Sequence, residues 1–131
     1  MKLKIFWILN LMKKYLDNFY LNLFLSFTWI LLSLYSFFTK ASPPKFPIIF
    51  LNDKFFHFII FFVMTYLLLI TLKSSRLNYN FQSKIILLIL ILIFSFLIEF
   101  LQSLTTYRSF ELEDIFFNFL GIFVFFFVKI K

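Results

Sequence analysis

The sequence has no cysteine, one glycine and three prolines among its 131 residues. Without cysteine the chain forms no disulfide and offers no thiolate to a metal ion, so its composition leaves the redox compartment open. A single glycine leaves little room for a glycine-rich loop that cradles phosphate groups. Charged residues make up only 15% of the chain and hydrophobic residues 63%, which is far above the apolar content of a soluble domain. The composition therefore indicates a membrane protein.

Four continuous apolar runs are the main organisational feature. A helix needs about 20 apolar residues to cross roughly 30 Å of hydrocarbon, and the first three runs reach or approach that length. The fourth run is short. It can cross the membrane only if the polar residues that flank it lie at the two membrane–water interfaces. We therefore expect an all-α integral membrane protein with four transmembrane helices, at about residues 19–38, 55–72, 85–104 and 115–128.

Residues 19–131 form one four-helix membrane domain in this interpretation. Residues 1–18 precede it as a cytoplasmic or interfacial segment. On a helical wheel one arc carries polar residues, opposite apolar residues such as Phe6 and Leu9; its members are Lys2, Asn10, Lys13, Lys14 and Asp17. That pattern is typical of an amphipathic helix lying on a membrane surface. A frayed basic tail is an equally open alternative.

Basic residues are distributed unevenly between the two ends of the expected helices. Nine lysines and arginines fall on the side of the termini and four on the opposite side, along with five of the six acidic residues. The positive-inside rule then places both termini in the cytoplasm. The net charge of +7 mostly reflects this asymmetry. It indicates contact with anionic lipids rather than nucleic acid.

Polar residues interrupt the apolar runs at the end opposite the termini. Ionisable groups cost about 2.5–3.5 kcal/mol each at the centre of a membrane helix, so those beside the spans are expected to have a use. Spacings of three, four and seven residues place the members of each cluster on one helix face. The three clusters are therefore expected to meet in one layer near the outer membrane surface. They are Asp53, Lys54 and His57; Glu99 and Gln102; and Asp114, Asn118 and Gly121.

These residues make a plausible chemical set. His57, Glu99 and Asp114 are the catalytic candidates because they supply acid–base groups. The ligand-binding candidates are Lys54, Arg108, Gln102 and Asn118, and Arg108 or Lys54 is also the available partner for Glu99. We assign structural roles to Asp53, as a helix cap or first-turn acid, and to Gly121, where a neighbouring helix can approach closely. No spacing matches a metal motif, so the sequence predicts no metal site and no cofactor.

The ordered set of motifs resembles the VanZ-like family of small bacterial membrane proteins. The fragments are Asp53-Lys54-x-x-His57-Phe58, Glu99-x-x-Gln102, Arg108 and Asp114-x-x-x-Asn118-x-x-Gly121. The resemblance covers roughly residues 20–128. It implies an integral membrane protein whose polar signature lies near one membrane face. The family takes its name from a member associated with reduced susceptibility to the glycopeptide antibiotic teicoplanin, and it supplies no reaction.

The leading hypothesis is an envelope protein that binds or modifies an amphiphilic or lipid-linked molecule at the outer face, with a possible link to teicoplanin susceptibility. Its partners would be membrane lipids and a lipid-linked envelope precursor or glycolipopeptide. The alternatives are a small proton-coupled transporter and a non-catalytic assembly subunit whose polar cluster locks helices together. The sequence leaves open whether the protein is an enzyme, and what its oligomeric state is.

Overall fold

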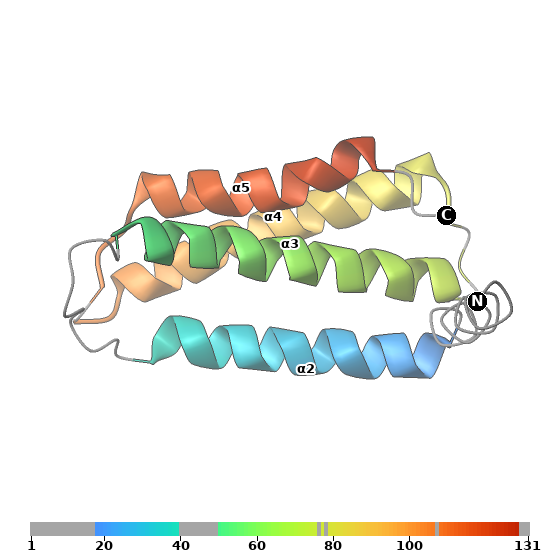
Figure 1. The fold of residues 1–131 in the computed structure, drawn as a ribbon, viewed down its shortest axis with the longest axis horizontal. Helices are drawn as coiled ribbons and strands as arrows, with labels where there is room; N and C mark the ends of the chain where they lie inside the picture. The colour runs from blue at the N-terminus through green and yellow to red at the C-terminus, as the bar shows by residue number, and fades with distance from the viewer. Residues whose placement is uncertain (1–17, 40–49, 76, 78, 107, 129–131) are drawn as a thin grey trace, which may run out of the picture.

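The structure, a computed structural model, describes residues 18–39, 50–75, 77, 79–106 and 108–128 (Figure 1). Within these ranges the chain is helical and contains no strand. The all-α prediction is therefore confirmed. The helices are α2 (Phe19–Phe38), α3 (Phe50–Ser74), α4 (Phe81–Ser103) and α5 (Leu112–Phe127).

Three of these helices are long and apolar enough to cross a membrane: α2, the Asp53–Ser74 part of α3, and α4. The fourth, α5, has 16 residues. At a rise of 1.5 Å per residue it measures about 24 Å, less than the roughly 30 Å of a hydrocarbon core. The described residues thus support three of the four predicted spans by length. The predicted amphipathic segment lies outside them, apart from Asn18, whose side chain caps α2 by accepting from the backbone N–H of Leu21 at 3.2 Å.

Three helices begin earlier than the apolar pattern suggested, and α5 does so at Leu112, three residues before the predicted position. The first described turn of α3 starts at Phe50, five residues before the predicted Phe55, so that Asp53 lies within the helix as a first-turn acid. At α4, Asn80 and Ser83 form a reciprocal capping box, in which Asn80 Oδ1 accepts from Ser83 N at 2.8 Å and Ser83 Oγ accepts from Asn80 N at 2.9 Å. Polar capping residues therefore start α4 before its apolar run.

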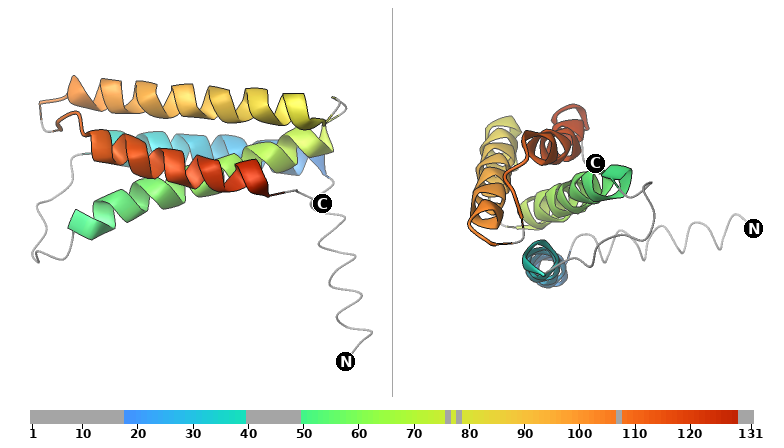
Figure 2. Two further views of the ribbon diagram at one scale, coloured as in Figure 1. Left: turned by 90° about the horizontal axis from the view of Figure 1, so that it is seen from above. Right: turned by 90° about the vertical axis from the view of Figure 1, so that its left-hand side faces the viewer.

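The helices lie side by side, and each runs opposite to the next along the chain (Figure 1). The end of α2, the start of α3, the end of α4 and the start of α5 consequently meet at the same end of the bundle. The end-on view in Figure 2 shows α3 between α2 and α5, with α4 beside α5. In agreement with that view, α3 packs against both α5 and α2, and α4 packs mainly against α5.

The core is apolar, with polar contacts between helices. Its most buried large side chains include Phe37, Phe61, Met64, Leu69 and Ile98. Between α2 and α3, the hydroxyls of Ser26 and Thr71 share a hydrogen bond of 2.8 Å, and Trp29 Nε1 donates to Ile60 O at 3.1 Å. A bilayer offers no water to buried polar atoms. Hydroxyl and indole N–H groups therefore suit positions where a neighbouring helix supplies the hydrogen-bond partner.

The outward faces carry large apolar side chains, as a surface in contact with lipid requires. Phe24 is 65% exposed, Leu90 57% and Phe116 56%. Their exposure would be costly in water, whereas lipid tails are as apolar as these side chains. The exposed surface therefore agrees with the apolar composition.

Gly121 lies where α5 crosses α3. A Cβ atom at this position would stand 2.5 Å from the carbonyl oxygen of Phe58 and 3.0 Å from the amide nitrogen of Phe62. Both are backbone atoms, so neither can move aside without moving α3. The close approach of the two helices requires a residue without a side chain at this point.

Candidate functional site

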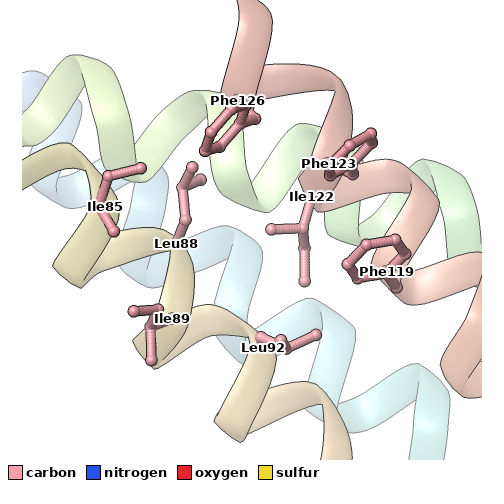
Figure 3. A pocket seen from close by; sticks show the side chains of 8 residues that line it. All are labelled: Ile85, Leu88, Ile89, Leu92, Phe119, Ile122, Phe123 and Phe126. Atoms are coloured by element: carbon pink, nitrogen blue, oxygen red, sulfur yellow. The ribbon is translucent and has the colours of Figure 1, made fainter. Parts of the chain in front are cut away.

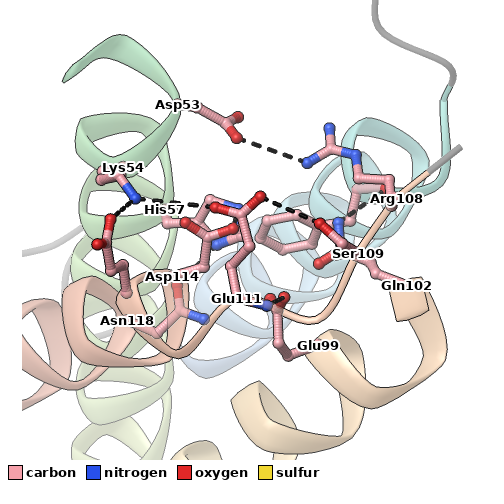
Figure 4. Close-up of polar contacts among 12 residues, drawn as sticks. Asp53, Lys54, His57, Glu99, Gln102, Arg108, Ser109, Glu111, Asp114 and Asn118 are labelled. Carbon is pink, nitrogen blue, oxygen red and sulfur yellow. Dashed lines mark hydrogen bonds and ion pairs between the residues drawn. The ribbon is translucent and has the colours of Figure 1, made fainter. Parts of the chain in front are cut away.

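The polar clusters selected from the sequence lie together at the end of the bundle where α2 and α4 end and α3 and α5 begin (Figure 4). Each is positioned by its helix. Asp53 and Asp114 lie in the first turns of α3 and α5, where the positive end of the helix dipole favours a carboxylate. Glu99 lies in the last turns of α4, and Arg108 in the connection that follows. We refer below to the buried side chains at this end as the polar layer: His57, Glu99, Gln102, Asp114 and Asn118.

The polar layer is almost fully enclosed. Its side chains range from 0% exposed for Asn118 to 4% exposed for Asp114. Each has one polar atom without a hydrogen-bond partner among the described residues: His57 Nε2, Glu99 Oε2, Gln102 Oε1, Asp114 Oδ1 and Asn118 Nδ2. Leaving a buried polar atom unpaired costs about 1–3 kcal/mol, and such atoms are few in native proteins. Their concentration in one layer is the pattern expected of a site that binds something polar.

His57 is held from both α5 and α2. Its Nδ1 lies 3.1 Å from Oδ1 of Asn118, and its Nε2 lies 3.5 Å from Oδ2 of Asp114. The ring of Phe37 packs against it with ring centroids 5.0 Å apart. The imidazole therefore has a fixed orientation, with Nε2 directed toward the first turn of α5.

Glu99 and Gln102 each bind a backbone group. One carboxylate oxygen of Glu99 accepts from the N–H of Glu111 at 3.0 Å, so that Glu99 ties the end of α4 to the start of α5. Gln102 Nε2 donates to the carbonyl oxygen of Phe37 at 3.0 Å and so joins α4 to the end of α2. Each side chain also keeps one oxygen, Oε2 of Glu99 and Oε1 of Gln102, that has no hydrogen-bond partner among the described residues.

Both cations pair with carboxylates nearer the surface than Glu99. Lys54 contacts Glu113 and lies 3.8 Å from Oε2 of Glu111. Arg108 Nη1 lies 3.7 Å from Oδ2 of Asp53, whose side chain is half exposed. Arg108 and Lys54 were the available partners for Glu99 in the sequence, and in the structure Glu99 accepts from the backbone N–H of Glu111.

Two residues contribute groups to the candidate site but were not among the site residues predicted from the sequence. Phe37 supplies a carbonyl oxygen and a ring, and the backbone N–H of Glu111 binds Glu99. No sequence signal marks a backbone group as part of a site, because every residue carries one. The acidic run before Asp114 was noticeable, but its backbone contact depends on how the connection between α4 and α5 folds.

An apolar groove lies along α4 and α5, on the side of the polar layer nearer the C-terminus of α5 (Figure 3). Phe119, directly after Asn118, is at one end of the groove lining and Phe126 at the other. They are separated by seven residues, or about 10 Å along a helix. The lining consists of Ile85, Leu88, Ile89, Leu92, Phe119, Ile122, Phe123 and Phe126.

Comparison with known protein families identifies the relationship. The model of the family described as VanZ/LLP1 matches residues 4–130, nearly the whole chain. The chain belongs to the VanZ/LLP1 family. The resemblance inferred from the motifs is therefore confirmed. No curated protein and no solved structure gives a significant match to this VanZ-family chain.

Family membership and helix composition agree. A VanZ-family chain with three helices long and apolar enough to cross a membrane is a VanZ-like membrane protein. The polar and charged residues of the motifs quoted above lie either in the polar layer or in the ion pairs above it. Their catalytic or ligand-binding roles remain predictions.

Proposed function

We propose that this protein binds the polar head of an amphiphilic or lipid-linked molecule in the polar layer. One observation carries the proposal: five enclosed side chains from three helices each keep a polar atom unpaired among the described residues. A ligand that supplies hydroxyl, amide or phosphate groups would satisfy these atoms and recover part of the desolvation cost. The set offers both acceptors and donors, so it suits a head group with several polar functions.

The apolar groove supports an amphiphilic ligand over a purely polar one. It begins one residue after Asn118 and continues along α4 and α5 with a lining of aliphatic and phenyl groups. This arrangement follows the usual division of a ligand site into an apolar wall and a few polar groups.

Arg108 and Lys54 support an anionic head group. Their ion pairs have N···O distances of 3.7 Å to Asp53 and 3.8 Å to Glu111, and both acids are half exposed. Both pairs are long and solvent reaches their acidic partners, so they contribute less stability than short, enclosed ion pairs. Exchanging such a carboxylate for a phosphate or carboxylate of the ligand would therefore cost little.

We further propose that the polar layer faces the outer side of the bacterial inner membrane, with both termini in the cytoplasm. The basis is the excess of basic residues on the side of the termini. In this orientation the site would meet lipid-linked envelope precursors and amphiphilic glycolipopeptides such as teicoplanin. His57, Glu99 and Asp114 would supply acid–base groups if binding is followed by a reaction.

Native mass spectrometry of protein released in mild detergent tests the proposal. Wild type should retain a lipid or envelope precursor, which Arg108→Ala and Glu99→Gln should lose while remaining folded. Lys73→Ala, at the other end of α3, is the matched control and should retain it. Identical spectra from wild type and both site variants would contradict the proposal.

A helix-locking assembly role is the second candidate, and it is favoured by contacts that join different helices. His57 to Asn118 links α3 with α5, and Gln102 to Phe37 links α4 with α2. This role predicts that the site variants lose a co-purifying protein, with bound lipid unchanged. The same spectra therefore distinguish it from ligand binding.

A proton-coupled transporter receives less support. The mid-bundle hydroxyls of Ser33, Thr65 and Ser95 are buried, but each donates to a carbonyl of its own helix, at 2.6–2.9 Å. A polar path through the bundle would need some of these groups to face one another. Proton flux in liposomes that disappears in Glu99→Gln would favour transport over binding.

A further inference from the structure

We propose that Asp53, His57 and Asp114 bind a divalent metal ion, with Zn²⁺ as the best-matched ion. One ligand atom from each residue can be chosen so that all three lie within 4.8 Å of one another. Asp53 and His57 lie one turn apart on α3, and Asp114 faces them from the first turn of α5. Because the ligands come from two helices separated in the chain by α4, no sequence spacing could have shown this cluster.

The orientation of His57 is that of a metal ligand. Its Nδ1 lies 3.1 Å from Oδ1 of Asn118, which can only accept, so the N–H donates there. The neutral ring then carries its lone pair on Nε2. Histidines that bind metals commonly donate their other N–H to a fixed acceptor, which sets the tautomer and the ring direction. Asn118 provides that acceptor.

The lone pair of Nε2 faces a carboxylate. Nε2 lies 3.5 Å from Oδ2 of Asp114, and neither Nε2 nor Asp114 Oδ1 has a hydrogen-bond partner among the described residues. Both side chains are nearly fully buried, at 1% exposed for His57 and 4% for Asp114. Two electron-rich atoms enclosed in this way repel each other unless a proton on Nε2 or a metal ion lies between them. A metal ion would supply a positive charge there and use both atoms.

The ion pairs of the described residues leave room for a cation at the cluster. Lys54 contacts Glu113 and lies near Glu111, and Arg108 lies 3.7 Å from Asp53. The ion pair that Asp114 makes among the described residues is with His57. A divalent ion would compensate the carboxylates of Asp53 and Asp114 locally. It would also bind Asp53 in place of Arg108, which would free Arg108 to bind an anion.

The types of ligand atom in the cluster indicate which metal ion it would bind. One imidazole nitrogen with two carboxylate oxygens suits Zn²⁺, whereas Mg²⁺ prefers oxygen ligands and retains several waters. Three protein ligands leave a fourth position of a zinc site open to another molecule. Asp53 is half exposed, so the ion and that molecule would enter from its side. The inference concerns the protein alone and does not depend on the ligand proposed above.

Zinc binding to the full-length protein in mild detergent tests the inference. The protein is stripped with a chelator, titrated with ZnCl₂ by calorimetry, and then assayed for bound metal after desalting. Wild type should bind about one zinc ion per chain, more tightly than Mg²⁺. Asp53→Asn, which changes a half-exposed side chain and should leave the fold intact, should weaken binding at least about tenfold. His57→Ala and Asp114→Asn should abolish it.

Glu113→Gln is the matched control, because it removes an exposed carboxylate at the same end that is not part of the cluster. It should bind zinc as wild type does. Zinc should also raise the melting temperature of wild type and Glu113→Gln, and it should raise that of Asp53→Asn by less at the same zinc concentration. No zinc binding to wild type, or equal binding to wild type and a folded Asp53→Asn, would overturn the inference. Lipid retention is scored separately by mass spectrometry, so either proposal can fail alone.

Discussion

Nδ1 of His57 on α3 lies 3.1 Å from Oδ1 of Asn118 on α5, and this contact joins two helices that the whole of α4 separates in the chain. It is a buried polar contact between α3 and α5, as is the 3.5 Å contact between Nε2 of His57 and Oδ2 of Asp114. The side chains of His57 and Asn118 are enclosed, with exposures of 1% and 0%. The contact therefore links the stability of the bundle to the orientation of the candidate functional imidazole.

Replacing Asn118 with leucine should destabilise the protein by about 1–3 kcal/mol, because it leaves Nδ1 of His57 buried without an acceptor. Thermal unfolding in detergent measures the effect. Phe119→Leu is the control, since Phe119 is the adjacent residue and is 37% exposed. Equal melting temperatures for Asn118→Leu and wild type would show that the contact contributes little.

Gly121→Ala should separate α3 from α5. The added Cβ would meet backbone atoms of Phe58 and Phe62 at 2.5 and 3.0 Å, which cannot rotate away. We expect a loss of about 1–3 kcal/mol, typical of overpacking, measured by thermal unfolding. Val124→Ala, at a partly exposed position three residues farther along α5, should have a much smaller effect. A Gly121→Ala protein as stable as wild type would contradict the close approach of the two helices.

Lys84 should protect the end of α5. Its Nζ donates to the carbonyl oxygens of Phe126 at 3.2 Å and Val128 at 2.8 Å, groups that α5 itself leaves unpaired. Lys84→Met keeps the length of the side chain but removes the donors. Hydrogen exchange in residues 124–128 should become faster, whereas Lys73→Met should leave it unchanged. Unaltered exchange in Lys84→Met would exclude a capping role.

The hydroxyl pair of Ser26 and Thr71 should couple α2 to α3. A double-mutant cycle with Ser26→Ala and Thr71→Val isolates their 2.8 Å hydrogen bond. The expected coupling is about 0.6 kcal/mol, the average for such bonds between membrane helices. Strictly additive losses in unfolding free energy would show that the two hydroxyls act independently.

Much of the fold was predictable because apolar runs of sufficient length have few alternatives in a membrane. The span at residues 19–38 matches α2, and the others differ from the helices by a few residues at their ends. The differences arise where polar residues start a helix, as Asn80 and Ser83 do at α4. Apolar content alone cannot detect such a start.

The members of the polar layer were also predictable, because helical spacing and alternating helix direction bring their clusters to one end. Their partners were not. Glu99 binds the backbone of Glu111 rather than a cation, and Arg108 pairs with Asp53. Pairing depends on distances of a few ångströms between side chains on different helices, which spacing within each helix does not determine.

The sequence by itself determined that this is a helical membrane protein of the VanZ/LLP1 family with its polar residues at one end, because composition, periodicity and motif order are properties of the chain. The tertiary structure alone decided which polar atoms are enclosed without partners, and that Asp53, His57 and Asp114 converge. These polar atoms become enclosed, and these three residues come together, only when α3 packs against α5. Because Gly121 has no side chain, it allows these two helices to approach closely.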